Sequence, residues 1–362
     1  MPYRILSQLL VLIVAATWMA GCDNGPAPYQ PPVLTNGGEE KLTHRVVSLS
    51  PSLTKMIIDM GREKSVVGVA ANDPFAPAKA VVVGTATQVS QDALLKADPT
   101  HVLLIADENE TPASLSEMAK LHKFKLISYV TPQSVDDVWD IIVDSDDITV
   151  SETGVTVSED GDSLCVAVDA VPAGMDLRTS MISKLDAMSK LKPGFDKKRT
   201  RVLVISALKP KLVAVGPKTA LSDVMTTYVG IDNAAIPVRE IPKITDPKKI
   251  PEIKPVLTED QIGRAPEMNE ERLLATKADV IVLMIPGADA LKSINEDPRL
   301  EPFRGLKIPA VENNRFVLIS EFPAGSGASS LIPRVAAALA KAAYPENASK
   351  FDAAIKSETP EE

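Results

Sequence analysis

Two separate stretches of this sequence alternate short β-branched runs with helical patterns, and this alternation restricts the fold more than any other feature. In the first stretch the β-branched runs lie at residues 46–49, 66–69 and 102–105, with helical patterns at 53–60 and 91–96. In the second they lie at 201–205, 280–284 and 315–319, with helical patterns at 220–228 and 270–276. Such alternation is typical of a mainly parallel sheet flanked by helices. The sequence therefore predicts an α/β fold with an N-terminal lobe over residues 44–143 and a C-terminal lobe over 199–348.

The segments between and after the lobes have patterns of their own. An apolar stripe at every third or fourth residue, formed by Leu177, Met181, Leu185 and Met188, predicts one long helix over 176–198 that links the lobes. Before it, alternating apolar and polar residues with glycine turns predict a β insertion over 144–175. A proline-rich insertion covers 237–266, a last helix covers 331–343, and a tail covers 349–362.

The first residues indicate export. Arg4 precedes an apolar run at residues 9–19, which is shorter than the ~20 residues of a membrane-spanning helix. Ala20-Gly21-Cys22 then stands where a small-residue cleavage site is expected. We interpret residues 1–21 as a lipoprotein signal peptide, Cys22 as the lipidated residue, and residues 22–43, rich in proline and glycine, as a flexible tether. The alternative is an ordinary secretory signal with a chance cysteine, and both alternatives predict an exported protein.

Charge and cysteine content exclude several classes of protein. Without residues 1–21 the chain has 38 basic and 48 acidic side chains, a net charge of −10, which argues against nucleic acid as a partner. The sequence has two cysteines, so lipid on Cys22 would leave Cys165 without a partner for an intramolecular disulfide. Aromatic residues make up 4% of the chain, which is low for a protein that binds planar ligands by stacking.

Several segments together resemble one family. The N-terminal segments are HRVVSLSPSLTKMIIDMGREKSVVGVAANDPF and VGTATQVSQDALLKADPTHVLLI. The C-terminal ones are VLVISALKPKLVAVGPKTALSDVMTTYVGIDNAA, MNEERLLATKADVIVLM and KIPAVENNRFVLISEFPAGSGASSLIPRVAAALAKAAYPE. In this order and spacing they resemble the helical-backbone periplasmic binding proteins of ABC importers for cobalamin, haem and ferric siderophores, and the haemin-binding branch in particular.

The resemblance implies a function and a set of partners. It implies a monomeric, lipid-anchored substrate-binding protein, not an enzyme, at the periplasmic or extracytoplasmic face of the membrane. Its partners would be an ABC permease with its ATPase and a small metal chelate or tetrapyrrole, with no cofactor of its own. It also implies two lobes bridged by one long helix, with the ligand held in the cleft between them. The insertions at 144–175 and 237–266 are longer than is usual in this family.

Proteins of this family dock on the permease through one acidic residue on each lobe, early in a helix. The matching residues are Asp92 in VSQDALL and Glu271 in MNEERLL. A carboxylate in a first helical turn is also favoured by the helix dipole, so a purely structural role is the alternative for both. Ser90 and Asn269 precede these helices and are predicted to cap them.

Ligand contacts are expected in loops at the carboxyl ends of the strands, where open α/β sheets bind ligands. The candidates in these loops are Ser50, Ser52, Asn72, Asp73, Phe75, Thr85, Lys209, Lys211 and Phe322. Their composition predicts a pocket of polar and small side chains. The resemblance gives Thr85 the position of the tyrosine that ligates haem iron in the haemin branch, and a threonine hydroxyl is a poor iron ligand. Lys209 and Lys211 are candidates to pair with an anionic ligand, and the alternative is that both are solvated surface residues.

The remaining candidates for site chemistry are few. His44, His101 and His122 are not at metal-ligand spacing from one another, so we interpret all three as structural and predict no metal site. No nucleophile motif is visible, so no catalytic residue is predicted. Two other functions remain open: a scaffold lipoprotein of the same fold without small-ligand binding, and an envelope metal chelatase.

Overall fold

The computed structural model describes residues 44–107, 110–144, 148–151, 154–157, 161–193, 198–237, 262–322 and 326–356. The proposed signal peptide, Cys22, the tether and most of the proline-rich insertion lie outside these residues. Within them, no helix combines the length and the apolar composition needed to span a bilayer.

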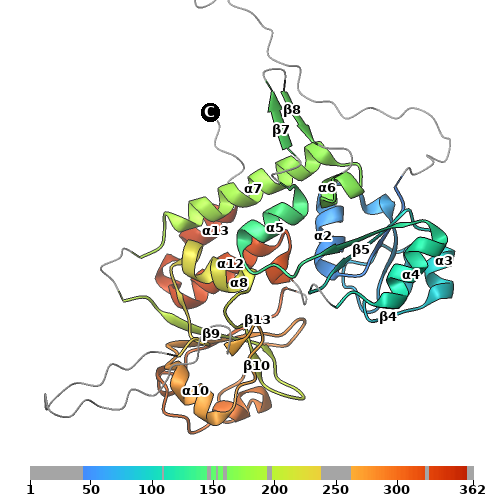
Figure 1. Cartoon of the computed structure of the whole chain (residues 1–362). Helices are drawn as coiled ribbons and strands as arrows, with labels where there is room; N and C mark the ends of the chain where they lie inside the picture. Colours follow the sequence, from blue (N-terminus) through green and yellow to red (C-terminus); the bar gives the residue numbers. More distant parts are fainter. Residues whose placement is uncertain are drawn as a thin grey trace, which may run out of the picture. The chain divides into compact units, whose positions relative to one another are not determined.

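The N-terminal part forms a six-stranded sheet of order β4-β3-β2-β1-β5-β6, parallel except for β4 (Figure 1). Its strands are β1 (Val46–Ser48), β2 (Val66–Ala70), β3 (Val81–Thr85), β4 (Gln88–Val89), β5 (His101–Ile105) and β6 (Lys125–Tyr129). The helices are α2 (Pro51–Asp59), the 3-10 helix η1 (Glu63–Ser65), α3 (Gln91–Ala97), α4 (Ala113–His122) and α5 (Val135–Ile142). Both faces of the sheet are apolar because helices cover both.

The C-terminal sheet has the order β10-β9-β12-β13, with β11 paired to β9. Its strands are β9 (Arg201–Ala207), β10 (Val213–Ala214), β11 (Asp232–Asn233), β12 (Val280–Met284) and β13 (Phe316–Ile319). The helical elements around it are α8 (Ala220–Asp223), η3 (Val224–Val229), α10 (Glu270–Thr276), η4 (Pro298–Phe303), α11 (Pro309–Glu312), η5 (Ser326–Ala328), α12 (Ile332–Ala343), η6 (Pro345–Asn347) and α13 (Ala348–Lys356). The expected fold class, two mainly parallel sheets flanked by helices, is confirmed.

The linking helix is present with different bounds. It is α7 (Val171–Ser189), and Met181, Leu185 and Met188 of the predicted stripe are buried. The β insertion before it is right in part, because β7 (Ile148–Ser151) and β8 (Gly154–Val157) form an antiparallel hairpin. Later in the expected β segment the structure has helices, namely α6 (Leu164–Ala167) and the first turn of α7. Leu164, Cys165 and Ala167 are all buried, a pattern that one face of a strand does not allow.

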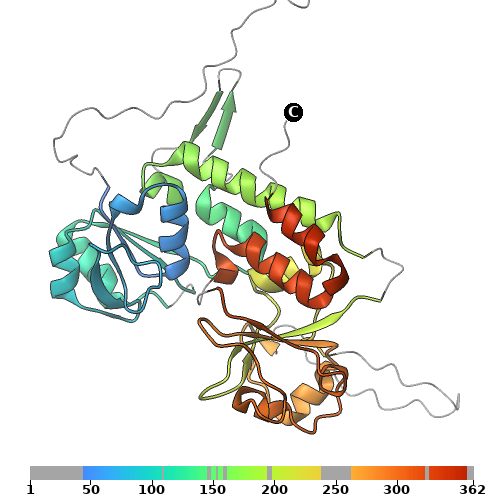
Figure 2. The ribbon, with the colours of Figure 1, turned by 180° about the vertical axis from the view of Figure 1, so that it is seen from behind.

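The predicted tail at 349–362 is wrong for its first residues. They form α13, in which Phe351 is fully buried and Ala354 is nearly so. α13 packs against α7 and α12, as both ribbon views show (Figure 2). The predicted end of the helix at 331–343 is confirmed, because α12 ends at Ala343, and Pro345 then opens the short 3-10 helix η6 that leads into α13.

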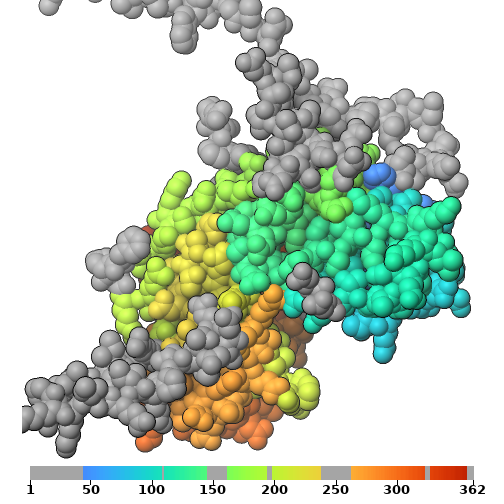
Figure 3. All heavy atoms as spheres, in the orientation of Figure 1, coloured from blue at the N-terminus to red at the C-terminus, as the bar shows by residue number. Residues whose placement is uncertain are grey.

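One continuous apolar core joins the two sheets. It begins at the face of the N-terminal sheet under α2, continues through α5, α6 and α7, and reaches α12, α13 and one face of the C-terminal sheet. In the space-filling view, α5 and α7 (green) and η3 (yellow) lie side by side on one face (Figure 3). Two smaller clusters fill the remaining face of each sheet. In β9, Val202 and Val204 face the shared core while Leu203 and Ile205 face the other cluster.

Two of the three histidines lie against each other at the amino ends of β1 and β5. The ring centroids of His44 and His101 are 5.1 Å apart. His44 Nδ1 bonds the carbonyl oxygen of Ala167 at 3.1 Å, and His101 Nδ1 bonds Thr100 Oγ1 at 2.9 Å. Burial, followed by the charges of His44 and Lys125, lowers the pKa of His101 from 6.5 to about 4.

Acid is therefore expected to destabilise the protein through His101. In the unfolded chain His101 binds a proton near pH 6.5, whereas in the folded state it does so only near pH 4. The free energy of unfolding is therefore highest above pH 6.5 and decreases as the pH falls from 6.5 toward 4. The shift corresponds to about 3 kcal/mol, which solvent screening of the half-buried ring reduces to roughly 1–2 kcal/mol. Urea unfolding at pH 7.5 and 4.5 should show this loss in the wild type and a smaller one in His101→Gln. His122→Gln, at an exposed position, is the control; equal losses in all three proteins would contradict the assignment.

Candidate functional site

A cavity of about 320 Å³ lies where strands of both sheets end. Its walls come from residues after β6, at the ends of β9 and β12, beside β10, after β13 and at the start of α8. The side chains that line it are mostly small or apolar, among them Ala214, Val215, Leu221, Met284 and Phe322. Open α/β sheets bind ligands at the carboxyl ends of their strands, so this cavity is the candidate site.

One charged side chain, Arg264, lines this cavity among the residues that the structure describes. Its Nη1 donates to Asp107 Oδ1 at 2.5 Å, and Asp107 follows β5 of the N-terminal sheet. The Arg264 side chain is 30% exposed and that of Asp107 is 44% exposed. Hydrogen bonds from Arg264 and Thr131 hold the pKa of Asp107 below its usual value. The ion pair thus connects the ends of the two sheets beside the cavity.

The backbone around Arg264 is tied to the C-terminal sheet. Gly216 N donates to the carbonyl oxygen of Arg264 at 2.8 Å, and Ala214 N donates to that of Pro266 at 3.0 Å. A Cβ on Gly216 would overlap the carbonyl oxygen of Gly263 and lie 2.9 Å from that of Arg264. A glycine at 216 is therefore required for residues 263–266 to lie this close to the sheet.

The structure separates most of the predicted cleft residues from the cavity. Among them, only Phe322 lines it. Ser50 and Asp73 are buried: Ser50 Oγ accepts a hydrogen bond from Ile105 N at 2.9 Å, and Asp73 accepts one from Thr54 Oγ1 at 2.7 Å. Ser52 is also buried. The bonds of Ser50 and Asp73 attach the loop after β1 to the end of β5 and the loop after β2 to α2, which is a structural contribution.

The other predicted cleft residues lie nearer the surface. Asn72, Thr85, Lys209 and Lys211 are exposed, and Lys211 Nζ pairs with Glu267 Oε1 at 2.6 Å. Thr85 Oγ1 accepts a hydrogen bond from Gln88 N at 3.1 Å in the turn between β3 and β4. Phe75 is half-buried, with Lys55 Nζ 6.0 Å from its ring centroid. Whether any of these residues binds a ligand stays a prediction.

The two predicted docking residues have equivalent local surroundings. Asp92 lies in the first turn of α3 and Glu271 in the first turn of α10, both helices have seven residues, and both side chains are exposed. The predicted caps are confirmed, because Ser90 accepts a hydrogen bond from Ala93 N and Asn269 accepts one from Arg272 N. Their role in docking stays a prediction.

The sequence placed Asp107 in a loop expected to supply cleft residues without selecting it as a ligand contact, and it did not indicate Arg264. Asp107 lies in a loop at the carboxyl end of a predicted strand, so its position pointed to the cleft. Arg264 lies near the end of the proline-rich stretch at 237–266, which has no periodicity, and no local signal indicated that it would reach the cavity. Across the described residues, no group of three or more His, Cys, Asp and Glu side chains is arranged to hold a metal ion.

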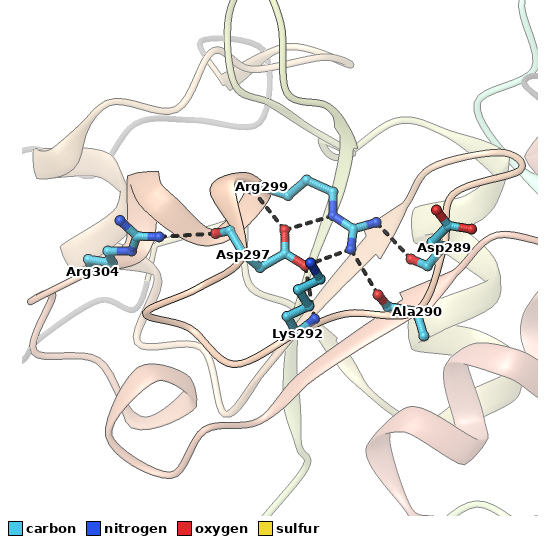
Figure 4. A network of polar contacts seen from close by, with 6 residues as sticks. All are labelled: Asp289, Ala290, Lys292, Asp297, Arg299 and Arg304. Carbon is cyan, nitrogen blue, oxygen red and sulfur yellow. Dashed lines mark hydrogen bonds and ion pairs between the residues drawn. The ribbon is translucent and has the colours of Figure 1, made fainter.

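A second polar network holds the long segment that follows β12. Asp297, 1% exposed, accepts hydrogen bonds from Arg299 Nη2 at 2.6 Å, Arg299 Nε at 2.8 Å and Lys292 N at 3.0 Å (Figure 4). Arg299 also donates to the carbonyl oxygens of Asp289 and Ala290. The bonds from Arg299 hold the pKa of Asp297 far below its usual value. These bonds hold residues 289–299 together, in the segment that follows Pro286, and Pro286 itself lines the cavity.

Comparison with family models found no match, and comparison with curated proteins found none either. Solved structures do match. The periplasmic heme-binding protein RhuT from Roseiflexus sp. RS-1 has 18% identity and a TM-score of 0.58, over 86% of this chain and 99% of that one. The heme-binding protein HutB of Vibrio cholerae has 16% identity and a TM-score of 0.56, over 82% and 98%.

A possible iron-binding, periplasmic solute-binding protein from Staphylococcus epidermidis has 18% identity and a TM-score of 0.55, over 83% of this chain and 98% of that one. These three matches extend over both sheets and nearly all of each matched protein. This chain therefore has the fold of the periplasmic heme-binding and solute-binding proteins that these structures represent.

Proposed function

We propose that this protein is the substrate-binding protein of an ABC importer and carries an iron chelate or a tetrapyrrole, such as haemin, a ferric siderophore or cobalamin. The observation that carries the proposal is the cavity at the joined strand ends of two sheets, in a fold shared with heme-binding and iron-binding periplasmic proteins. Apolar walls with one guanidinium suit a largely apolar ligand that carries negative charge. Such a receptor needs no catalytic group, and its further partners are a permease and an ATPase.

A ligand panel tests this proposal. Thermal unfolding of the purified mature protein should be measured with haemin, ferric siderophores and cobalamin, since a ligand that binds only the folded state stabilises it by about 2.7 kcal/mol at 100 times its Kd. Ala265→Trp places a bulky side chain at the cavity wall and should reduce the shift. Ala353→Trp, on the exposed side of α13, is the matched control. No shift with any ligand would contradict substrate binding and favour the scaffold alternative.

Membrane attachment is proposed to depend on lipid at Cys22, which lies outside the described residues. Cys22→Ser should therefore move the protein from the membrane fraction to the soluble fraction, because the acyl chains that insert into the bilayer would no longer be attached. Fractionation followed by immunoblotting measures this. Tight membrane association of the variant would contradict the lipoprotein interpretation.

Haem, among the proposed ligands, has a test of its own. Thr85→Tyr adds a phenol at the position that the resemblance gives to the iron ligand, and Thr85 is exposed, so the larger side chain can be accommodated. We expect tighter haemin binding, by about tenfold, and a phenolate–iron absorption band. Thr85→Phe adds the ring without the oxygen and should give no band. Unchanged spectra and affinity in the tyrosine variant would leave an iron chelate as the favoured ligand.

A further inference from the structure

We propose that Arg264 binds a carboxylate of the ligand and that Asp107 takes the place of this carboxylate while the cavity is empty. The inference rests on the proposed function, because it assigns a chemical feature to the ligand of the same cavity. It makes Arg264 the residue that selects ligands with an apolar body and an acidic group.

The charges around the cavity favour such an exchange. An anionic partner stabilises the Arg264 guanidinium, because the apolar wall removes part of its hydration while 30% of the side chain stays exposed. Asp107 supplies this partner from a loop after β5 and is itself 44% exposed. When a ligand displaces it, the Asp107 carboxylate can return to water at low cost. An aspartate is ionised at neutral pH with its ordinary pKa, so Asp107 can pair with Arg264 or stay charged in water, as the exchange requires.

The ligand can make contacts that Asp107 cannot. Asp107 reaches Arg264 from beside the cavity, through Arg264 Nη1. A ligand carboxylate attached to an apolar body can meet the guanidinium with two parallel hydrogen bonds, while the body packs on Leu221, Met284 and Phe322. A cavity of about 320 Å³ holds part of a tetrapyrrole rather than the whole molecule. Arg264 would then determine that the acidic edge enters first.

The position of Arg264 is determined by the backbone rather than by the side chain alone. The hydrogen bonds of Arg264 and Pro266 to the backbone of Gly216 and Ala214 attach this segment to the sheet. Gly216→Ala would force the segment outward, since the new Cβ would meet the carbonyl oxygens of Gly263 and Arg264. This variant moves the guanidinium without removing it.

The test uses haemin and haemin dimethyl ester at a matched detergent concentration, because the two differ in free carboxylates. Absorbance titration of the wild-type protein should give tighter binding of haemin by about 10- to 100-fold, the range for hydrogen bonds to charged groups. Arg264→Gln should reduce this preference to about one, and Gly216→Ala should reduce it in the same direction. Circular dichroism should verify that each variant is folded.

Asp107→Asn gives the result that distinguishes exchange from a merely structural ion pair. We expect it to strengthen haemin binding several-fold and to leave the binding of the ester unchanged, because the competing carboxylate is gone. Glu110→Gln removes a charge from the same loop and is the matched control, for which no tightening is expected. If both variants bind haemin more tightly by the same factor, the cause is the loss of negative charge near the cavity rather than the loss of a competing carboxylate, and the proposal is overturned.

Failure of this inference and failure of the proposed function give different results. If the wild-type protein binds haemin and its ester equally, or binds neither, the assignment of Arg264 is overturned. The ligand panel, which includes ferric siderophores and cobalamin, independently decides whether the protein is a substrate-binding protein.

Discussion

Asp297→Asn is expected to lower the free energy of unfolding by about 3 kcal/mol, because it removes one partner of a buried, hydrogen-bonded ion pair. The Asp297 carboxylate is 1% exposed and accepts bonds from Arg299 and from the backbone of Lys292 (Figure 4). Asparagine keeps the size of the side chain but loses the charge and one acceptor oxygen. Arg299 would then keep its bonds to the carbonyl oxygens of Asp289 and Ala290 without a carboxylate to balance its charge.

Urea unfolding at pH 7, followed by circular dichroism, measures this loss. Glu296→Gln is the matched control, since it removes a carboxylate from the adjacent exposed position and should change stability by less than about 0.5 kcal/mol. A loss below 1 kcal/mol in Asp297→Asn would mean that solvent or other groups replace the carboxylate.

Charge reversal at Asp92 and Glu271 together is expected to abolish uptake while leaving the affinity for ligand nearly unchanged. Each residue lies exposed in the first turn of a seven-residue helix, and neither lines the cavity. If they bind basic surfaces of a permease, lysine at both positions turns two attractions into repulsions. The loss of the favourable contacts with the helix dipoles should cost only about 0.3–1 kcal/mol per residue, so the protein should remain folded.

Uptake of labelled ligand should be measured in cells whose own gene carries both substitutions, and affinity on the purified protein. Gln91→Lys combined with Glu270→Lys changes the charge of the preceding exposed residue on each helix and is the matched control, expected to retain uptake. A parallel loss of ligand affinity in the Asp92 and Glu271 variant would show that these residues act on the cavity. If the control loses uptake to the same extent, the effect comes from the overall charge of this surface and not from Asp92 and Glu271 in particular.

Local patterns in the sequence were sufficient for several elements. The helix at 270–276 and the strand at 280–284 have the predicted bounds. A capping residue precedes the helix, and the strand is a short unbroken run of apolar residues, as in a strand buried on both faces. The caps of α3 and α10 follow from Ser90 and Asn269, whose side chains bond backbone three residues ahead. The bounds of α7 and the helical nature of α6 were missed because burial against neighbouring helices, not local period, decides them.

The sequence alone determined what short-range physics controls: the α/β class, the two sheets, the linking helix and the caps. Tertiary structure decided which distant side chains meet. Asp107 and Arg264 are 157 positions apart, and His44 and His101 meet because β1 and β5 pair side by side. No local pattern carries such information, because the partner of a charged group is chosen by chain topology and by the cost of leaving that group unpaired beside an apolar wall.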